Sequence, residues 1–377
     1  MASLVRHIAE IPAPPFEEEV RGQWVAQRLL EFTGRTPEVD ALGNRWVVLQ
    51  GAQGRGKRLL LSAHLDTVFP AGTDCSVRER DGLLCGPGIG DNCAGLAVLL
   101  MFARLLTQAQ CPFAGELLIA ANVGEEGVGD LRGMKALCER LGATLQGTLA
   151  LDGGLGHVVG EAVGSQRYRV TVRGPGGHSW SEFGTPSAIH HLARVATALA
   201  DLKVTDLQRV AFNIGEIHGG TSINTIAAHA TMLVDLRSID AAALAELDVR
   251  AQRKLHAVPC PKDLQLVIEK IGARPTGNPQ LTREWVEVAA AACVALGLTV
   301  KVTASSTDAN VPLAAGLRAS TLGICRTGRT HTLDEWLDPS SLPLGLETLA
   351  LTVLTALRIF PAPDLLLPKV FVEHEIP

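Results

Sequence analysis

Histidine, aspartate and glutamate residues recur where apolar segments of this chain end. His64, Glu126 and Asp152 each follow an apolar run typical of a strand, and Asp91 ends a glycine-rich loop before an apolar helix. A fifth candidate, His331, follows the last predicted strand. In open α/β sheets, sites form outside the carboxyl ends of the strands. The pattern therefore predicts one cleft on which two imidazoles and three carboxylates converge.

Such a cluster needs positive charge, because buried like charges without compensation are costly. Two divalent metal ions would supply it, and with one shared carboxylate each ion would have three protein ligands and an open position. Each residue also has a simpler interpretation. Asp91 fits a turn before a helix, Glu125 and Glu126 fit a solvated acidic loop, and His331 fits a surface histidine. Their joint occurrence favours the metal site.

Two further carboxylates could assist this chemistry. Residues two apart in a strand point the same way, so Asp66 is expected to reach the far ring nitrogen of His64 and fix its tautomer. Glu125 and Glu126 are adjacent and must diverge. One of them can bind metal while the other stays off it and acts as a general base.

Length, charge and cysteine content limit the class of protein. The 377 residues suit about two domains, and the formal net charge of −5 argues against a nucleic-acid partner. Eight scattered cysteines form no C-x-x-C pair and indicate free thiols in a reducing compartment. The N-terminus has no signal-peptide pattern, and the apolar run after Asp91 is expected to be too short to span a bilayer. We expect a cytoplasmic protein with no membrane partner.

The elements around the candidate site alternate between strand and helix. Near-continuous apolar strands, of which 58–63 is the clearest, alternate with helices such as 92–108. From about residue 165 the order becomes βαββαβ, with one strand expected at 208–217, as in a ferredoxin-like sandwich. We therefore expect an α/β domain formed by residues 1–165 and 275–377, with a smaller domain, 166–274, inserted into it.

Five motifs, in this order, resemble those of one family. They are SAHLDTV at 62–68, GIGDN at 88–92, GEEG at 124–127, LDG at 151–153 and THTLDE at 330–335. The chain is similar over nearly its whole length to the co-catalytic zinc exopeptidases and deacylases, which include peptidase T, glutamate carboxypeptidase, aminoacylase and acetylornithine deacetylase. The resemblance implies a mixed-sheet, three-layer αβα catalytic domain. It also implies an inserted ferredoxin-like lid and dimerisation domain, and hence a homodimer.

The resemblance also implies a role for each ligand. Asp91 would bridge two zinc ions, which cobalt or manganese could replace. His64 and Asp152 would complete one site, and Glu126 and His331 the other.

Three other roles follow from the same resemblance. Glu125 would be the base that activates the bridging water, and Asp66 would orient His64. An aspartate at the position of Asp152 accompanies the aminopeptidase-like members of the family. It favours a peptidase T-like tripeptidase or aminopeptidase.

The inserted domain contains candidates for substrate binding. His178, in GPGGHS, resembles a lid histidine that stabilises the tetrahedral intermediate, often in the active site of the partner subunit. Asn224, in GGTSIN, and Arg237, in DLR, match lid motifs, and Arg274 matches a position that in some members clamps a substrate carboxylate. A histidine in a glycine turn or an arginine on a strand can also be structural.

Several alternatives remain. An N-acyl amino acid deacylase or a carboxypeptidase of the same family is the second enzyme hypothesis, so the substrate is a small peptide or an N-acyl amino acid. A non-catalytic metal-binding relative is disfavoured, because every expected metal and base position is occupied. A dinucleotide loop starting at Gly88 is rejected, since Cys93 replaces the third glycine and Asp91 would repel a pyrophosphate. The chain also has no G-x-S-x-G motif of a serine hydrolase.

Overall fold

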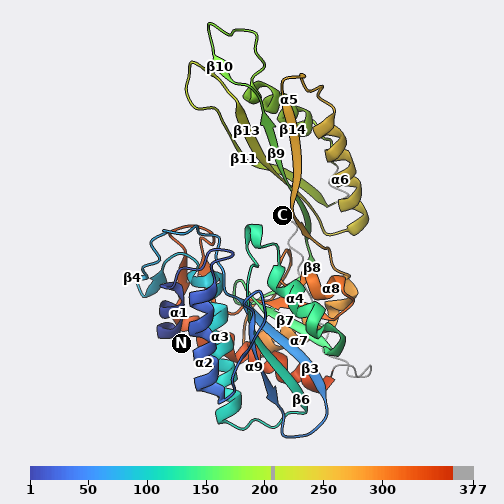
Figure 1. The fold of residues 1–377 in the computed structure, drawn as a ribbon. Coiled ribbons are helices and arrows are strands. Elements are labelled where there is room, and N and C mark those ends of the chain that lie inside the picture. Colours follow the sequence, from blue (N-terminus) through green and yellow to red (C-terminus); the bar gives the residue numbers. More distant parts are fainter. Residues whose placement is uncertain (205–208, 360–377) are drawn as a thin grey trace. The chain divides into compact units, whose positions relative to one another are not determined.

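The computed structural model describes residues 1–204 and 209–359 (Figure 1). It divides into two compact units, which we describe separately: a first unit of residues 1–162 and 278–377, and a second unit of residues 163–277. Two expectations fall partly outside the described residues. They are the start of the strand expected at 208–217 and the last eighteen residues of the expected catalytic domain, 360–377.

An eight-stranded mixed sheet forms the centre of the first unit, with the order β1-β2-β6-β3-β7-β16-β8-β15. The strand β3 lies parallel to both β6 and β7, whereas β2 pairs antiparallel with β6. The strands are β1 (Glu38–Val39), β2 (Arg45–Gln50), β3 (Lys57–His64), β6 (Gly115–Asn122), β7 (Gly147–Leu151), β8 (His157–Ala162), β15 (Lys301–Ser305) and β16 (Ala319–Leu322).

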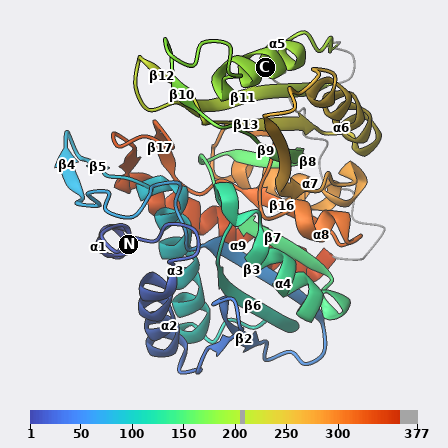
Figure 2. The ribbon, with the colours of Figure 1, turned by 45° about the horizontal axis from the view of Figure 1, so that its top comes forward.

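Helices cover both faces of this sheet, which gives three layers (Figure 2). On β3, the side chains of Leu59 and Leu61 pack into one core, and that of Leu60 packs into the other. The first core lies against α1 (Ala2–Ala9), α2 (Glu19–Thr33), α3 (Gly95–Gln108), α7 (Arg283–Ala295) and α9 (Leu342–Ile359). The second lies against α4 (Arg132–Leu141) and α8 (Asn310–Ala314). Burial on both faces explains why these strands are apolar at almost every position.

Two helical segments of the described chain are long and apolar enough to cross a membrane by length and composition alone. They are Ile89–Gln108 and Pro339–Arg358. The expectation that the run after Asp91 is too short was therefore wrong. The fold buries 78% of the apolar window in the first segment and 56% in the second, as expected of helices that pack on a sheet.

A small four-stranded sheet of the first unit joins distant parts of the chain. Its order is β17-β18-β5-β4, and β18 pairs antiparallel with β5 so that Trp336 lies opposite Cys85. The strands are β4 (Arg78–Arg80), β5 (Leu83–Cys85), β17 (Arg326–Gly328) and β18 (Trp336–Asp338). This pairing places the segment after His331 beside the loop that contains Asp91. None of these strands was expected from the sequence.

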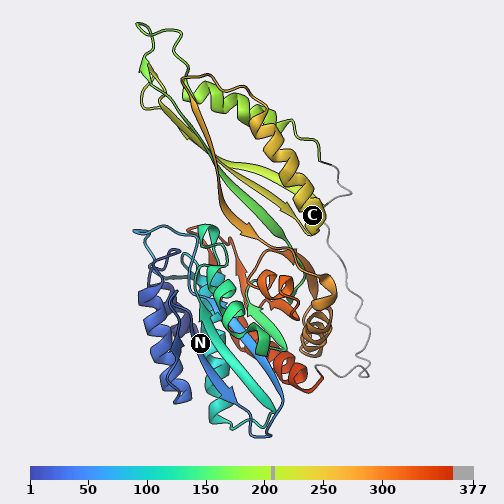
Figure 3. The same ribbon diagram turned by 45° about the vertical axis from the view of Figure 1, so that its right-hand side comes forward.

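The second unit is an antiparallel sheet with the order β11-β13-β9-β14 and the chain order βαββαβ. The helices α5 (Ala188–Ala200) and α6 (Ala241–His256) lie on one face of this sheet (Figure 3). Alternate side chains of β9 (Gly164–Arg173), such as Tyr168 and Val170, pack against them. The other strands are β10 (Gly177–His178), β11 (Val210–Gly219), β12 (Thr225–Ile226), β13 (His229–Ser238) and β14 (Gln265–Arg274). The order and directions are those of a ferredoxin-like sandwich. The expected fold class, α/β with a large mixed sheet, is confirmed.

Candidate metal centre

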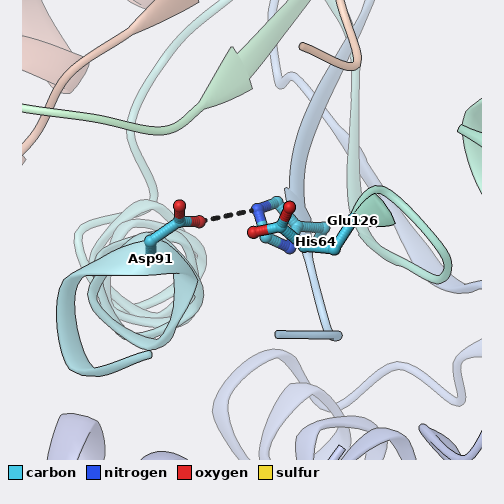
Figure 4. A group of neighbouring side chains, drawn as sticks. All are labelled: His64, Asp91 and Glu126. Atoms are coloured by element: carbon cyan, nitrogen blue, oxygen red, sulfur yellow. Dashed lines mark ion pairs between the residues drawn. The ribbon is translucent and has the colours of Figure 1, made fainter. Parts of the chain in front are cut away.

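Three of the expected ligands lie together at one edge of the main sheet (Figure 4). His64 is the last residue of β3, Asp91 lies in the turn before α3, and Glu126 lies in the loop after β6. Each points a side-chain atom toward the others, and these atoms all lie within 4.8 Å of one another. Because β3 and β6 are parallel neighbours, their carboxyl ends bring His64 and Glu126 to the same place.

The two carboxylate oxygens of Asp91 face two different imidazoles. Oδ1 lies 3.1 Å from Nε2 of His64, and Oδ2 lies 3.1 Å from Nε2 of His331. The same His331 nitrogen lies 3.2 Å from Oε1 of Glu126. Asp91 thus stands between one histidine from the N-terminal part of the chain and one from the C-terminal part.

These distances fit ligands of a divalent metal. Two atoms bound tetrahedrally to one ion at about 2.0 Å are separated by about 3.3 Å. His64 Nε2 and Asp91 Oδ1 are buried, yet they form no hydrogen bond of acceptable geometry. Two buried polar atoms that face each other without bonding are costly unless a third species satisfies both. The donor set, imidazole with carboxylate, is one that zinc uses.

Asp152 lies at the same edge, directly after β7. Its N–H donates to the carbonyl of Leu322, which fixes the strand end. Burial, and then the negative charge of Asp91, raise the pKa of Asp152 well above its ordinary value. The structure therefore places Asp152 within electrostatic reach of Asp91, where its ionised form would require a nearby cation.

Without metal, the histidines are held in their charged form by the carboxylates. Hydrogen bonds to Asp91 and Glu126 raise the pKa of His331 to about 10. Burial alone would lower the pKa of His64, but Asp66 and Asp91 raise it well above the ordinary value. Burial alone would likewise raise the pKa of Asp91, but the two histidines hold it well below its usual range. Protons thus stand in for part of the positive charge that the cluster needs.

Asp66 acts differently from the expectation. The far ring nitrogen of His64, Nδ1, donates to the backbone carbonyl of Asp66 at 3.0 Å, whereas the carboxylate oxygen Oδ1 of Asp66 lies 3.6 Å away. Because a carbonyl only accepts, the neutral ring of His64 carries its proton on Nδ1 and has its Nε2 lone pair available for a metal. The carboxylate instead accepts the N–H groups of Glu125 at 2.9 Å and Glu126 at 2.7 Å. Asp66 therefore orients His64 and anchors the Glu125–Glu126 loop at once.

Glu125 is buried beside this group, and its backbone is fixed by Asp66. The adjacent Glu126 sends its side chain to His331.

Two polar residues near the centre were missed by sequence reasoning. Glu335, four residues after His331, accepts backbone N–H groups from the loop that contains Asp91. Burial raises its pKa to about 7, although the N–H groups of Asp91 and Gly90 oppose the rise. Asn92 donates from its side chain to the carbonyl of Leu151 at 2.7 Å and so ties the Asp91 loop to the strand end before Asp152. Both act on the backbone, which leaves no spacing signal in the sequence.

His178 and Asn224 lie next to each other in the second unit. The short strands β10 and β12 pair His178 with Thr225, and the N–H of Ser179 donates to the carbonyl of Asn224. Nδ1 of His178 accepts the N–H groups of Trp180 at 3.2 Å and Ser181 at 3.4 Å. The neutral ring therefore carries its proton on Nε2, which is free to act as a donor.

Arg237 and Arg274 lie together at the opposite end of the same sheet. Both are cross-strand neighbours of Ser165 on β9. Arg237 shares the carboxylate of Asp235 with Arg167. From Ser165 to Arg173, where the sheet ends on the His178 side, the strand rises about 26 Å. The four candidates for substrate binding thus form two separate pairs and not one site within the second unit.

Comparison with known proteins places this site in a family. The sequence profile of peptidase family M20/M25/M40 matches residues 60–355. A succinyl-diaminopimelate desuccinylase of Corynebacterium glutamicum is 27% identical over 243 residues, which cover 62% of this chain and 65%, just under two thirds, of the relative. A probable carboxypeptidase of Aspergillus flavus is 25% identical over 306 residues, 74% of this chain and 68% of the relative.

A solved structure has the same fold. The aminopeptidase PepT of Bacillus cereus superimposes with a TM-score of 0.70 at 22% identity, over 94% of this chain and 98% of that one. The family profile matches well over half of the chain and spans the expected ligands from His64 to His331. The resemblance and the enzyme class expected from the sequence are thereby confirmed: the chain belongs to peptidase family M20/M25/M40, and so to the hydrolases.

Proposed function

We propose that this chain hydrolyses amide bonds with two divalent metal ions, zinc in the first instance, and that cobalt or manganese can replace zinc. The observation that carries the proposal is the position of Asp91, with one carboxylate oxygen on His64 and the other on His331. A carboxylate placed in this way suits a bridge between two ions. His64 and Asp152 would hold one ion, and Glu126 and His331 the other. When bound, such ions polarise the scissile carbonyl and make a water more acidic.

The proton transfers are assigned to Glu125. Its carboxylate takes the proton of the attacking water and passes it to the leaving amine. Two features support this assignment: Glu125 is buried, and Asp66 fixes the backbone of this loop by accepting the N–H groups of Glu125 and Glu126. A base held in this way is oriented before the substrate arrives.

We assign the stabilisation of the developing oxyanion to His178, whose Nε2–H is free to donate a hydrogen bond to it. Arg274 pairs with Ser165 at one end of β9, and the strand rises about 26 Å before the chain leads on to His178, which is longer than a tripeptide can span. If Arg274 clamps the carboxylate of a small substrate, that substrate meets His178 of the partner subunit. We therefore propose a homodimer formed through the second unit, which serves as the lid and dimerisation domain. The first unit is the catalytic domain.

The substrate class has three candidates. Asp152 favours a peptidase T-like tripeptidase or aminopeptidase. Sequence relatives that are desuccinylases favour an N-acyl amino acid deacylase, and the guanidinium groups of Arg237 and Arg274 suit a carboxylate-bearing substrate of either class. A carboxypeptidase is also represented among the relatives. The net charge of −5 disfavours a nucleic acid or a membrane as the partner. The eight free cysteines are typical of a reducing compartment, and together the two observations support a small cytoplasmic substrate.

A substrate panel on metal-reconstituted protein tests this proposal. Free tripeptides, N-succinyl amino acids and C-terminally blocked peptides are compared in zinc, cobalt and manganese, with chelator-treated protein as the control. Faster cleavage of tripeptides from the free amino end supports the aminopeptidase, and exclusive cleavage of N-acyl amino acids replaces it with the deacylase. No metal-dependent cleavage of any amide would refute the proposed function.

A further inference from the structure

Glu335 has no role in the proposed reaction, yet it lies against the backbone of the loop that contains Asp91. Its Oε1 accepts the N–H of Gly90 at 2.8 Å and that of Asp91 itself at 2.9 Å, and its Oε2 accepts the N–H of Gly88 at 3.3 Å. The side chain is fully buried. Three N–H groups of one turn that converge on a carboxylate form an anion-binding nest, filled here by a residue of the same chain.

Position as well as charge links Glu335 to this loop. The small sheet pairs β5 with β18, so the N–H of Gly86 donates to the backbone carbonyl of Glu335 at 2.9 Å. The loop is fitted closely around the carboxylate. A Cβ at Gly90 would lie 3.0 Å from Oε1 of Glu335 and would collide with the hydroxyl of Thr327. Any residue larger than glycine at position 90 would push the loop off its anchor.

The same segment contains a second ligand. His331 lies four residues before Glu335, and both face Asp91, His331 through its side chain and Glu335 through the backbone N–H. A carboxylate next to the negative charge of Asp91 is unfavourable on charge grounds alone, because like charges raise each other's energy. The three N–H bonds, and the loop geometry that they impose, must therefore offset this repulsion for a glutamate to be favourable at position 335.

We propose that Glu335 is a positioning residue for the metal centre, which holds the Asp91 backbone in register with His331 so that both oxygens of Asp91 can bind. This inference rests on the proposed function, because it takes Asp91 to be a metal ligand. Glu335 touches neither substrate nor metal. It acts through Asp91, so we expect its substitution to change metal affinity and coordination geometry more than the stability of the fold.

Three substitutions of Glu335 separate the effect of side-chain length from the effect of charge. Glu335→Gln retains an oxygen for Gly90 and Asp91 without the charge, Glu335→Asp retains the charge but is one methylene too short, and Glu335→Ala removes both. Leu29→Ala is the matched control, since Leu29 is an apolar residue buried in the same unit on α2. Metal affinity is measured by chelator competition, and site geometry by the visible absorption of the cobalt-substituted protein.

Loss of a partner that orients a ligand weakens metal binding by about 10- to 100-fold. We expect this for Glu335→Asp and Glu335→Ala, with an altered cobalt spectrum. Glu335→Gln keeps two of the three N–H bonds and should weaken metal binding less, and Leu29→Ala should lower only the melting temperature. Wild-type affinity and spectrum in Glu335→Asp would overturn the inference, as would a Gln variant as weak as Ala. If Glu335→Ala does not fold, the Asp and Gln variants decide alone. Wild-type protein that binds no metal would instead refute the proposed function.

Discussion

The metal centre of the first unit and the His178 loop of the second unit are built on opposite principles. At the centre, His64, Asp66 and Glu335 are at most 1% exposed, and each is fixed by a backbone group. Around His178, Trp180 is 87% exposed and Phe183 92% exposed. The first arrangement exists before any substrate binds. The second leaves two large apolar side chains exposed, and in the proposed dimer these could contact the partner subunit.

The largest effect is expected where the centre depends on one residue. Asp91→Ala removes the shared carboxylate, so binding of both ions should fall by more than about 100-fold, the upper range for residues that only support a ligand. Metal content after dialysis measures this. The control Asp240→Ala removes a helix cap in the second unit and should cost about 1 kcal/mol of stability without loss of metal. Full metal content in Asp91→Ala would contradict the bridging role.

Glu125→Gln tests whether the catalytic base is a different residue from the metal ligands. Turnover should fall by about 10²- to 10⁴-fold, the usual contribution of a general base, while both ions stay bound. Rates and metal content are measured on the same preparation. A variant that loses metal together with activity would mean that Glu125 is a ligand.

His178→Ala should lower kcat by about 10²- to 10³-fold, the cost of losing one oxyanion donor. Mixing it with Glu125→Ala tests the open surface around it. If His178 acts across a dimer, hybrids contain one intact site, formed by Glu125 of one subunit and His178 of the other, and activity returns. If mixed dimers form and activity does not return, His178 acts within its own chain or not at all.

Metal binding should release protons, because His331 with a pKa of about 10 is protonated at pH 7 in the metal-free protein. The apparent affinity for metal should therefore rise as the pH rises toward about 10. In the metal-free protein the raised pKa has the opposite consequence: it stabilises the fold below about pH 6.5, and this stabilisation is lost as pH rises through about 10. Calorimetry in two buffers of different ionisation enthalpy counts the protons. Fewer should be released by His331→Ala.

The smallest effect is expected at the exposed loop. Trp180→Ser and Phe183→Ser should each change the free energy of unfolding by less than about 0.5 kcal/mol, because neither side chain is packed. Leu29→Ala, by contrast, should cost about 2–5 kcal/mol. Denaturant unfolding compares the three. A large loss of stability at Trp180 would remove the contrast between the two regions.

The sequence predicts the parts of the site that depend on strand ends. Apolar runs such as 58–63 mark buried strands. A charged residue directly after such a run lies at the carboxyl edge of the sheet. His64, Asp91 and Glu126 were therefore expected to meet, and their side chains do lie together.

The rest depends on contacts that leave no pattern. The strand β8 and the three-residue strands β5 and β18 are too short or too mixed to show a period. Glu335 binds backbone N–H groups 244 to 247 residues away, and any residue type can supply an N–H. The separation of His178 from Arg274 follows from the register of β9, which the sequence does not specify.

The pairing of β5 with β18 has a consequence for how the protein is made. The centre draws on residues 64 to 152 and on residues 331 to 335, so it cannot close until the second segment has left the ribosome. A nascent or truncated chain lacks His331 and the anchor of the Asp91 loop. The proposed amide hydrolysis can therefore start only after residues 331–335 have been synthesised and have joined the Asp91 loop.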